Sequence, residues 1–164
     1  MSLESVRAWL VEQAPDHADI DNGKSTATVA EAAQALGVEP ARIAKTLAVR
    51  VKDETFLLVT RGDARLDNQK TKAAFGGRPR MLGPEETLAV TGHPVGGVCP
   101  FGLATTLPVY CDVSLRAFGT IFPAAGSLTS SVEVTPERLA KLVAKDWVDL
   151  CRLPGDQAGS SSAD

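Results

Sequence analysis

The segment TVAEAAQALGVEPARIAKTLAVRVKDETFLLVT, residues 28–60, changes its hydrophobic period halfway along, and this change decides the fold class. Before Pro40 the apolar residues follow the i, i+3, i+4, i+7 spacing of one helical face. They are Val29, Ala32, Ala33 and Leu36. Thr26 or Thr28 can cap the start of this helix, and Gly37 stands where a helix-ending glycine belongs. The first half of the segment therefore predicts a helix.

The second half of the segment alternates with a period of two. Leu47, Val49 and Val51 are separated by Ala48, Arg50 and Lys52, and the apolar run FLLVT (56–60) follows after a charged turn. Apolar residues at every second position are typical of a half-buried strand, and two such runs around a short polar turn predict a β-hairpin.

Further helices and strands are interspersed on both sides of this segment. Helices are expected at the N-terminus, over 67–75, from Pro84 and from Thr135, and strands over 109–113, 121–122, 131–134 and 147–150. Hairpins are present and simple βαβ alternation is absent, so the pattern favours helices packed around a mixed or mostly antiparallel sheet.

Composition predicts one globular domain. The chain has 164 residues, of which 44% are hydrophobic and 23% charged, and its net charge of −3 excludes a uniformly basic nucleic-acid coat. No apolar stretch approaches the roughly 18 residues of a membrane span, and three cysteines without a CxxC suit reduced thiols in a cytoplasm. We expect a domain over 1–151 and a disordered tail over 152–164, because PGDQAGSSSAD has nothing to bury.

Most standard catalytic signatures are missing. The sequence has no GxxxxGK[ST], no GxGxxG after a strand and no GxSxG, and His17 and His93 lie far apart without cysteine pairs at ligand spacing. We therefore expect no metal and no cofactor.

The loop TGHPVGGVCPFG, residues 91–102, is the most informative segment for chemistry. It holds four glycines and two prolines. Glycine lets backbone approach a ligand closely, so the N–H groups of Gly96, Gly97 and Val98 can form a cradle for an oxyanion or phosphate. The alternative is a tight surface turn, since turns accumulate the same residues.

Three other features carry candidate chemistry. Lys45 interrupts an apolar strand, either as a functional cation or as a lysine that extends to solvent. Cys99 and His93 share one loop, which raises the hypothesis of a thiol nucleophile without an evident orienting acid. Residues 61–80 carry a local net charge of +4, which indicates either a solvated face or a phosphate-contacting edge.

Four motifs together resemble one known family. IAKTLAV with Lys45, TGHPVGGVCPFG, the turn AAGS (124–127) and EVTPERL (133–139) occur in this order in the YbaK-like proteins. These include the Cys-tRNA(Pro) deacylases and are similar to the editing domain inserted in bacterial prolyl-tRNA synthetases. The resemblance implies a mixed α/β pseudo-barrel of mostly antiparallel strands surrounded by helices. It also implies a free-standing enzyme that hydrolyses the ester of a mischarged tRNA, most often tRNA(Pro).

The resemblance also implies site residues and partners. The catalytic set is Lys45, Gly96, Gly97 and Val98. The substrate-binding set is Thr60, His93, Pro100, Phe101, Ala125, Gly126 and Ser127. The local positive charge of residues 61–80, and not the resemblance, gives the expected tRNA contacts Arg61, Arg65, Lys70 and Arg78. Partners would be the acceptor end of mischarged tRNA and prolyl-tRNA synthetase, for a cytoplasmic monomer or homodimer. Cys99 falls at a variable position of the family's G-x-x-x-P element, which lowers the thiol hypothesis.

Two other functions stay open from the sequence. One is a noncatalytic module that binds tRNA ends or a synthetase, and the other is a thiol hydrolase that uses Cys99. Among deacylase substrates, Cys, Ala, Ser and Thr differ only by a methyl group or a heteroatom, a difference worth about 1–3 kcal/mol. The packing of the pocket decides among these acyl groups.

Overall fold

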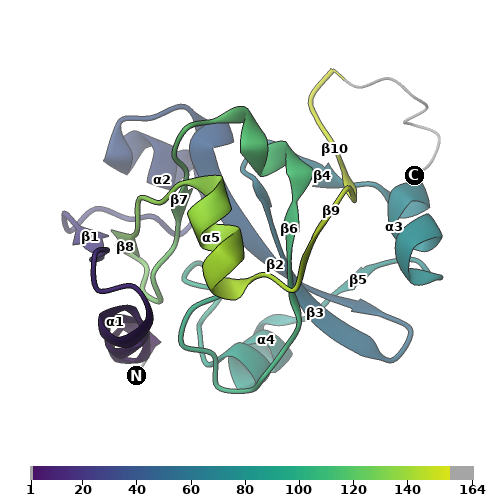
Figure 1. Ribbon diagram of the computed structural model, residues 1–164, viewed down its shortest axis with the longest axis horizontal. Coiled ribbons are helices and arrows are strands. Elements are labelled where there is room, and N and C mark those ends of the chain that lie inside the picture. Colours follow the sequence, from purple (N-terminus) through teal and green to yellow (C-terminus); the bar gives the residue numbers. More distant parts are fainter. Residues whose placement is uncertain (1, 156–164) are drawn as a thin grey trace.

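The fold is built around the hairpin predicted from the period change. The computed structural model describes residues 2–155, and the hairpin pairs β2 (Ile43–Val51) with β3 (Glu54–Arg61) over their whole length (Figure 1). Lys52, in the two-residue turn, has a φ of 54°, as two-residue hairpin turns require.

The main sheet is mixed. Its strand order is β5 (Arg80–Met81), β2, β3, β6 (Val109–Asp112) and β9 (Asp146–Val148), and β7 (Phe122–Pro123) also pairs with β2. β5 and β3 run antiparallel to β2, while β7 on β2, β6 on β3 and β9 on β6 are parallel. Two antiparallel pairs lie beside it: β1 (Ile20–Asp21) with β8 (Ser130–Ser131), and β4 (Arg65–Leu66) with β10 (Cys151–Arg152).

Helices pack around this sheet and confirm the mixed α/β class. They are α1 (Ser2–Gln13), α2 (Val29–Leu36), α3 (Asn68–Phe75), α4 (Pro84–Thr91) and α5 (Pro136–Val143), with short 3₁₀ turns η1 (Pro40–Arg42) and η2 (Val113–Ala117). Thr28 caps α2 by accepting a hydrogen bond from Glu31 N–H, and Gly37 ends it in the left-handed conformation. Within residues 2–155, no helix is long and apolar enough to cross a membrane.

The two faces of β2 enter different cores. Ala44 and Ala48 join the larger core with α1, α5 and β6, whereas Val49 and Val51 join a smaller core with Leu47 at its edge. This alternation follows from the period of two in the sequence. The alternation therefore determines which side chains of β2 lie on the same face of the sheet as a site beside the strand.

The C-terminal boundary differs from the prediction. Arg152 lies in β10, paired with Arg65 of β4, so the paired structure continues past residue 151. A two-residue strand is too short to show an alternating pattern, which is why β4, β5 and β10 were not predicted. Residues 156–164 of the expected tail lie outside the described residues.

Candidate functional site

The outer edge of β2 is interrupted between its two partners. β7 pairs with Ile43 and Ala44, and β5 pairs with Val49 and Arg50. Ala48 O accepts a hydrogen bond from Leu82 N–H at 3.1 Å, so the polar backbone groups of Ala48 face this outer edge. Backbone groups alternate along a strand, so those of Thr46 face the same edge. We call this gap at Thr46 the β2 notch.

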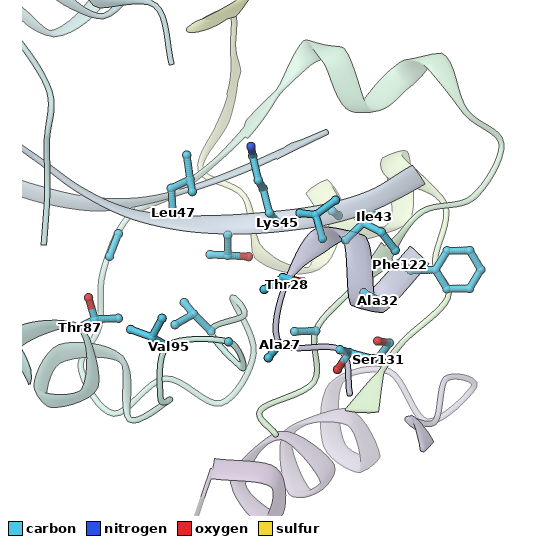
Figure 2. Close-up of a pocket in the computed structure, with 18 of the residues that line it drawn as sticks. Ala27, Thr28, Ala32, Ile43, Lys45, Leu47, Thr87, Val95, Phe122 and Ser131 are labelled. Carbon is cyan, nitrogen blue, oxygen red and sulfur yellow. The ribbon is translucent and has the colours of Figure 1, made fainter. Parts of the chain in front are cut away.

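A cavity of about 250 Å³ opens at the β2 notch (Figure 2). It is lined from both faces of β2, by Lys45 and Leu47 on one face and by Thr46 and Ala48 on the other, so it wraps around the free strand edge. The remaining walls come from the start of β2, from the segment before α2 and α2 itself, from β5 and α4, from the glycine loop, and from the segments around β7 and β8. These residues are Thr26, Ala27, Thr28, Val29, Ala32, Ile43, Ala44, Met81, Leu82, Thr87, Val95, Gly96, Val98, Phe122, Ala124 and Ser131.

The glycine loop forms one wall of this cavity. Gly96 and Val98 line it, and no hydrogen bond from either N–H group is found among the described residues. Gly96 has a φ of +97°, and a Cβ there would lie 2.8 Å from Leu128 Cδ2 and 3.2 Å from Ala27 Cβ. The loop is therefore held tightly between the segment before α2 and the turn at Leu128.

Gly97 has a different role from the one predicted. Its N–H donates to Pro94 O at 2.9 Å, so this amide closes the loop and is not free for a ligand. A Cβ on Gly97 would lie 3.1 Å from backbone atoms of Gly126 and Ser127. Gly97 thus joins the glycine loop to the AAGS turn, while Gly96 and Val98 remain the amides beside the cavity.

Lys45 lies on the far side of the strand from the glycine loop. Figure 2 shows its side chain on the side of β2 opposite Ala27 and Val95, as the alternation with Thr46 requires. Its Nζ donates to Ala64 O at 2.6 Å. Burial, and to a lesser extent Arg65, lower the pKa of Lys45 below its ordinary value. The structure does not bring the Lys45 ammonium and the loop amides together on one face.

His93 is buried and hydrogen-bonded at both ring nitrogens. It is fully buried, with Nδ1 at 2.5 Å from Ser2 Oγ and Nε2 at 2.7 Å from Phe101 O. A carbonyl only accepts hydrogen bonds, so Nε2 carries the proton and Nδ1 accepts from Ser2. Burial lowers the pKa of His93, which keeps the ring neutral. These two hydrogen bonds tie the loop to α1, and His93 is absent from the cavity lining, so its assignment to substrate binding stays a prediction.

Cys99 lacks the properties of a nucleophile. Its Sγ is completely buried, and burial raises the pKa of its thiol to about 12. His93 Nε2 lies 3.5 Å away but already holds a proton for Phe101 O, so it is not placed to act as a base. Since the thiolate is the reactive form, this environment argues against a thiol hydrolase.

The other predicted substrate-binding residues are also absent from the cavity lining. None of the seven belongs to its lining: Thr60, His93, Pro100, Phe101, Ala125, Gly126 and Ser127. Thr60 is buried on the Lys45 face beside Cys151, and Phe101 packs on Trp9 in the core. A motif predicts that a turn borders a site, but backbone geometry decides which residue of the turn faces it. In the AAGS turn that residue is Ala124.

Two threonines of the cavity were not predicted from the sequence. Thr26 is 7% exposed, and Thr46 is half-buried, and the hydroxyl oxygen of each is buried without a hydrogen-bond partner within residues 2–155. Natural proteins pair the large majority of buried polar side-chain atoms. The available signal was the position of Thr46, a polar residue between the core-facing Ala44 and Ala48.

The four predicted tRNA contacts within residues 61–80 differ in whether an ion pair holds their side chains. Arg61 forms an ion pair with Asp63 at 2.7 Å, and Lys70 forms one with Asp149 at 3.0 Å. In the part of the chain that the structure describes, no carboxylate lies within ion-pairing distance of Arg65 or Arg78. Of the four predicted tRNA contacts, these two exposed arginines keep their charge available.

The rim of the cavity is apolar. Val95 is 59% exposed and Met81 48% exposed, and both line the opening. Leu128, beside Gly96, is 47% exposed. These exposed apolar side chains make the surface beside the cavity suitable for an apolar contact with a ligand.

Comparisons with known proteins agree on one family. A model of the aminoacyl-tRNA editing domain matches residues 23–142. The uncharacterized protein YwhH of Bacillus subtilis is 46% identical over 154 residues, covering 93% of this chain and 98% of YwhH. The proline–tRNA ligase of Acidithiobacillus ferrooxidans is 36% identical over 86 residues, 52% of this chain but only 15% of the ligase. The crystal structure of a candidate trans-editing enzyme for prolyl-tRNA synthetase superposes with a TM-score of 0.83 at 33% identity, covering 92% of this chain and 97% of that one.

Proposed function

The chain belongs to the aminoacyl-tRNA editing domain family, and on this basis we propose that it hydrolyses the ester of a mischarged tRNA in trans. The proposed substrate is tRNA(Pro) that carries a small wrong amino acid, namely Cys, Ala, Ser or Thr. The resemblance to the candidate trans-editing enzyme for prolyl-tRNA synthetase supports this choice of tRNA. A cavity of about 250 Å³ suits a small acyl group with part of its ribose.

The observation that carries the proposal is a set of backbone amides around one small cavity that have no hydrogen-bond partner within residues 2–155. Gly96 and Val98 contribute N–H groups from the loop, and Thr46 contributes its own from the β2 notch. An aminoacyl ester is already activated, so its hydrolysis depends mainly on positioning a water and stabilising the developing oxyanion. Fixed backbone amides provide that stabilisation without a catalytic triad.

The proton transfers are assigned to the substrate. Lys45 is the one titratable residue among those that line the cavity, and its ammonium is directed away from the loop. In the proposed reaction the water oxygen attacks the ester carbonyl carbon and the water gives up a proton. The bond from the acyl carbon to the ribose oxygen breaks, and the leaving ribose oxygen takes up that proton. The neighbouring ribose hydroxyl relays that proton, because it lies next to both atoms in any aminoacyl-tRNA.

Lys45 is proposed to bind a phosphate at the 3′ end of the tRNA. Its ammonium lies at the notch on the face opposite the amides, near Arg65. The aminoacyl end of a tRNA would enter along the outer edge of β2. Its acyl group would then lie on the face of β2 that holds the loop amides, and its phosphate on the face that holds Lys45. Arg65 and Arg78 extend this contact, and the acidic overall charge keeps the affinity modest so that product is released.

The experiment is a deacylation panel with tRNA(Pro) charged separately with Ala, Ser, Cys, Thr and Pro. Wild-type protein is expected to hydrolyse at least one wrong ester and to spare Pro. Lys45→Ala should raise KM for the charged tRNA more than it lowers kcat, whereas the exposed Lys72→Ala serves as the matched control. Binding of all five tRNAs without hydrolysis would instead identify a noncatalytic tRNA-binding module.

A further inference from the structure

Thr46 carries three polar groups without a hydrogen-bond partner beside one cavity, within residues 2–155. Its backbone N–H and C=O face the β2 notch, and within residues 2–155 neither makes a hydrogen bond. Its hydroxyl is buried without a partner, and so is that of Thr26 in the same cavity wall. Buried hydroxyl groups are almost always paired, so two unpaired ones beside an open strand edge indicate a site that a ligand completes.

The unpaired backbone pair matches the chemistry of an amino acid. In an antiparallel pair, two residues that exchange both backbone hydrogen bonds each contribute one N–H and one C=O. An esterified amino acid offers the same two functions as an α-ammonium donor and an ester carbonyl acceptor. It can therefore occupy the β2 notch as a single additional strand residue, with its ammonium on Thr46 O and its carbonyl on Thr46 N–H.

This arrangement also places the side chain of the substrate. Residues directly opposite each other in a sheet project their side chains to the same face. The acyl side chain would lie beside the Thr46 side chain, on the face that also holds the glycine loop and Thr26. A change between staggered χ1 rotamers exchanges the hydroxyl and methyl positions of a threonine, so both residues can turn a hydroxyl toward the ligand.

We propose that Thr46 and Thr26 select a small hydroxylated amino acid, serine or threonine, bound along the β2 notch as a one-residue strand. This inference rests on the proposed function and adds the acyl group that it recognises. A substrate hydroxyl donates to one threonine and accepts from the other, which satisfies both buried oxygens. An alanyl group fits the same space but leaves both oxygens unpaired, and that difference favours the hydroxylated substrate.

The test uses non-hydrolysable adenosine amides that carry seryl, alanyl or 3-hydroxypropanoyl groups, the last of which lacks the α-amine. Wild-type protein should bind the seryl amide about ten- to hundredfold more tightly than either of the others. Thr46→Val and Thr26→Val, which keep side-chain shape, should each reduce the preference for seryl over alanyl. Thr46→Ser should retain that preference.

Thermal unfolding provides a second readout with the opposite sign. Valine removes an unpaired buried hydroxyl, so Thr46→Val and Thr26→Val should melt at the same temperature as wild type or higher. Thr71→Val is the matched control, because the buried Thr71 hydroxyl donates to Asp67 O at 2.9 Å. This control should melt lower and keep the acyl preference.

The outcomes separate the two proposals. Equal binding of seryl and alanyl amides, or equal loss of both in Thr46→Val, would overturn the recognition of a hydroxyl. A lower melting temperature of Thr46→Val would also overturn it, since the hydroxyl would then have a partner in the fold. Thr46-dependent preference in binding without hydrolysis of any charged tRNA would refute the deacylase function and leave the recognition intact.

Discussion

Replacing Gly96 by alanine tests whether the glycine loop holds the catalytic amides. The φ of +97° is one that residues with a Cβ rarely adopt, and holding alanine there costs about 1–3 kcal/mol. The new Cβ would also lie 2.8 Å from Leu128 Cδ2 and 3.2 Å from Ala27 Cβ. The exposed leucine can move aside, but Ala27 is part of the opposite wall, so the loop has to shift.

The expected result combines a moderate loss of stability with a large loss of rate. A cost of about 1–3 kcal/mol lowers the melting temperature by about 2–4 °C per kcal/mol in a chain of this size. Displacing one oxyanion donor typically lowers the rate by about 10²–10³. The assay is single-turnover deacylation of mischarged tRNA(Pro), at a temperature where thermal unfolding shows that the variant is folded.

Gly37→Ala is the matched control. Gly37 has a φ of +70° and no atom within 4 Å of its virtual Cβ, so alanine there adds backbone strain without a contact at the cavity. Its melting temperature should fall while its deacylation rate stays near wild type. If Gly96→Ala hydrolyses substrate as fast as Gly37→Ala, the loop does not supply the catalytic amides.

Three further changes test other parts of the argument. Cys99→Ser should keep most of the deacylase activity because the thiol is buried with a pKa of about 12, and an inactive, folded Cys99→Ser would restore the thiol hydrolase. Arg65→Gln with Arg78→Gln should reduce the slope of log K against log salt for tRNA binding by about one unit per lost phosphate contact, and an unchanged slope would make both residues ordinary surface. Burial lowers the pKa of His93 below its ordinary value of 6.5. On acidification the unfolded chain therefore binds a proton that the folded chain does not. The free energy of unfolding should be at its full value above pH 6.5 and decrease by at most about 1.4 kcal/mol per pH unit below it. Urea titrations of wild type and His93→Gln measure this, and identical slopes in both would show that another group titrates.

The elements with a long repeated pattern could be predicted from the sequence. The helix over Val29–Leu36 with its Thr28 cap and the hairpin of β2 and β3 follow from local spacing, because each buries one regular face. Strands such as β5 and β7 have two residues and are defined by their partner on β2. No local pattern encodes such a partner, and the β2 notch exists only because these two strands leave Thr46 uncovered.

The same distinction explains the result at the site. Proximity of the glycine loop and the AAGS turn was anticipated, and Gly97 lies against Gly126 and Ser127. The orientation of the polar groups was not anticipated. The N–H of Gly97 is hydrogen-bonded inside the loop, and the Lys45 ammonium lies on the opposite face of β2 from the loop. A sequence motif indicates which segments meet, whereas hydrogen bonds within the fold determine which atoms remain free for a ligand.

The narrowness of the β2 notch has a consequence for self-association. An exposed strand edge is a template on which another polypeptide can add a strand and aggregate, and proteins shorten or cover such edges. β2 is nine residues long, but β5 and β7 close its outer edge on both sides of Thr46. A docking strand needs hydrogen bonds to the backbone groups of several residues, whereas the β2 notch exposes the N–H and C=O groups of one residue. The fold can therefore keep a permanently open strand edge in the cell without exposing a surface on which other chains polymerise.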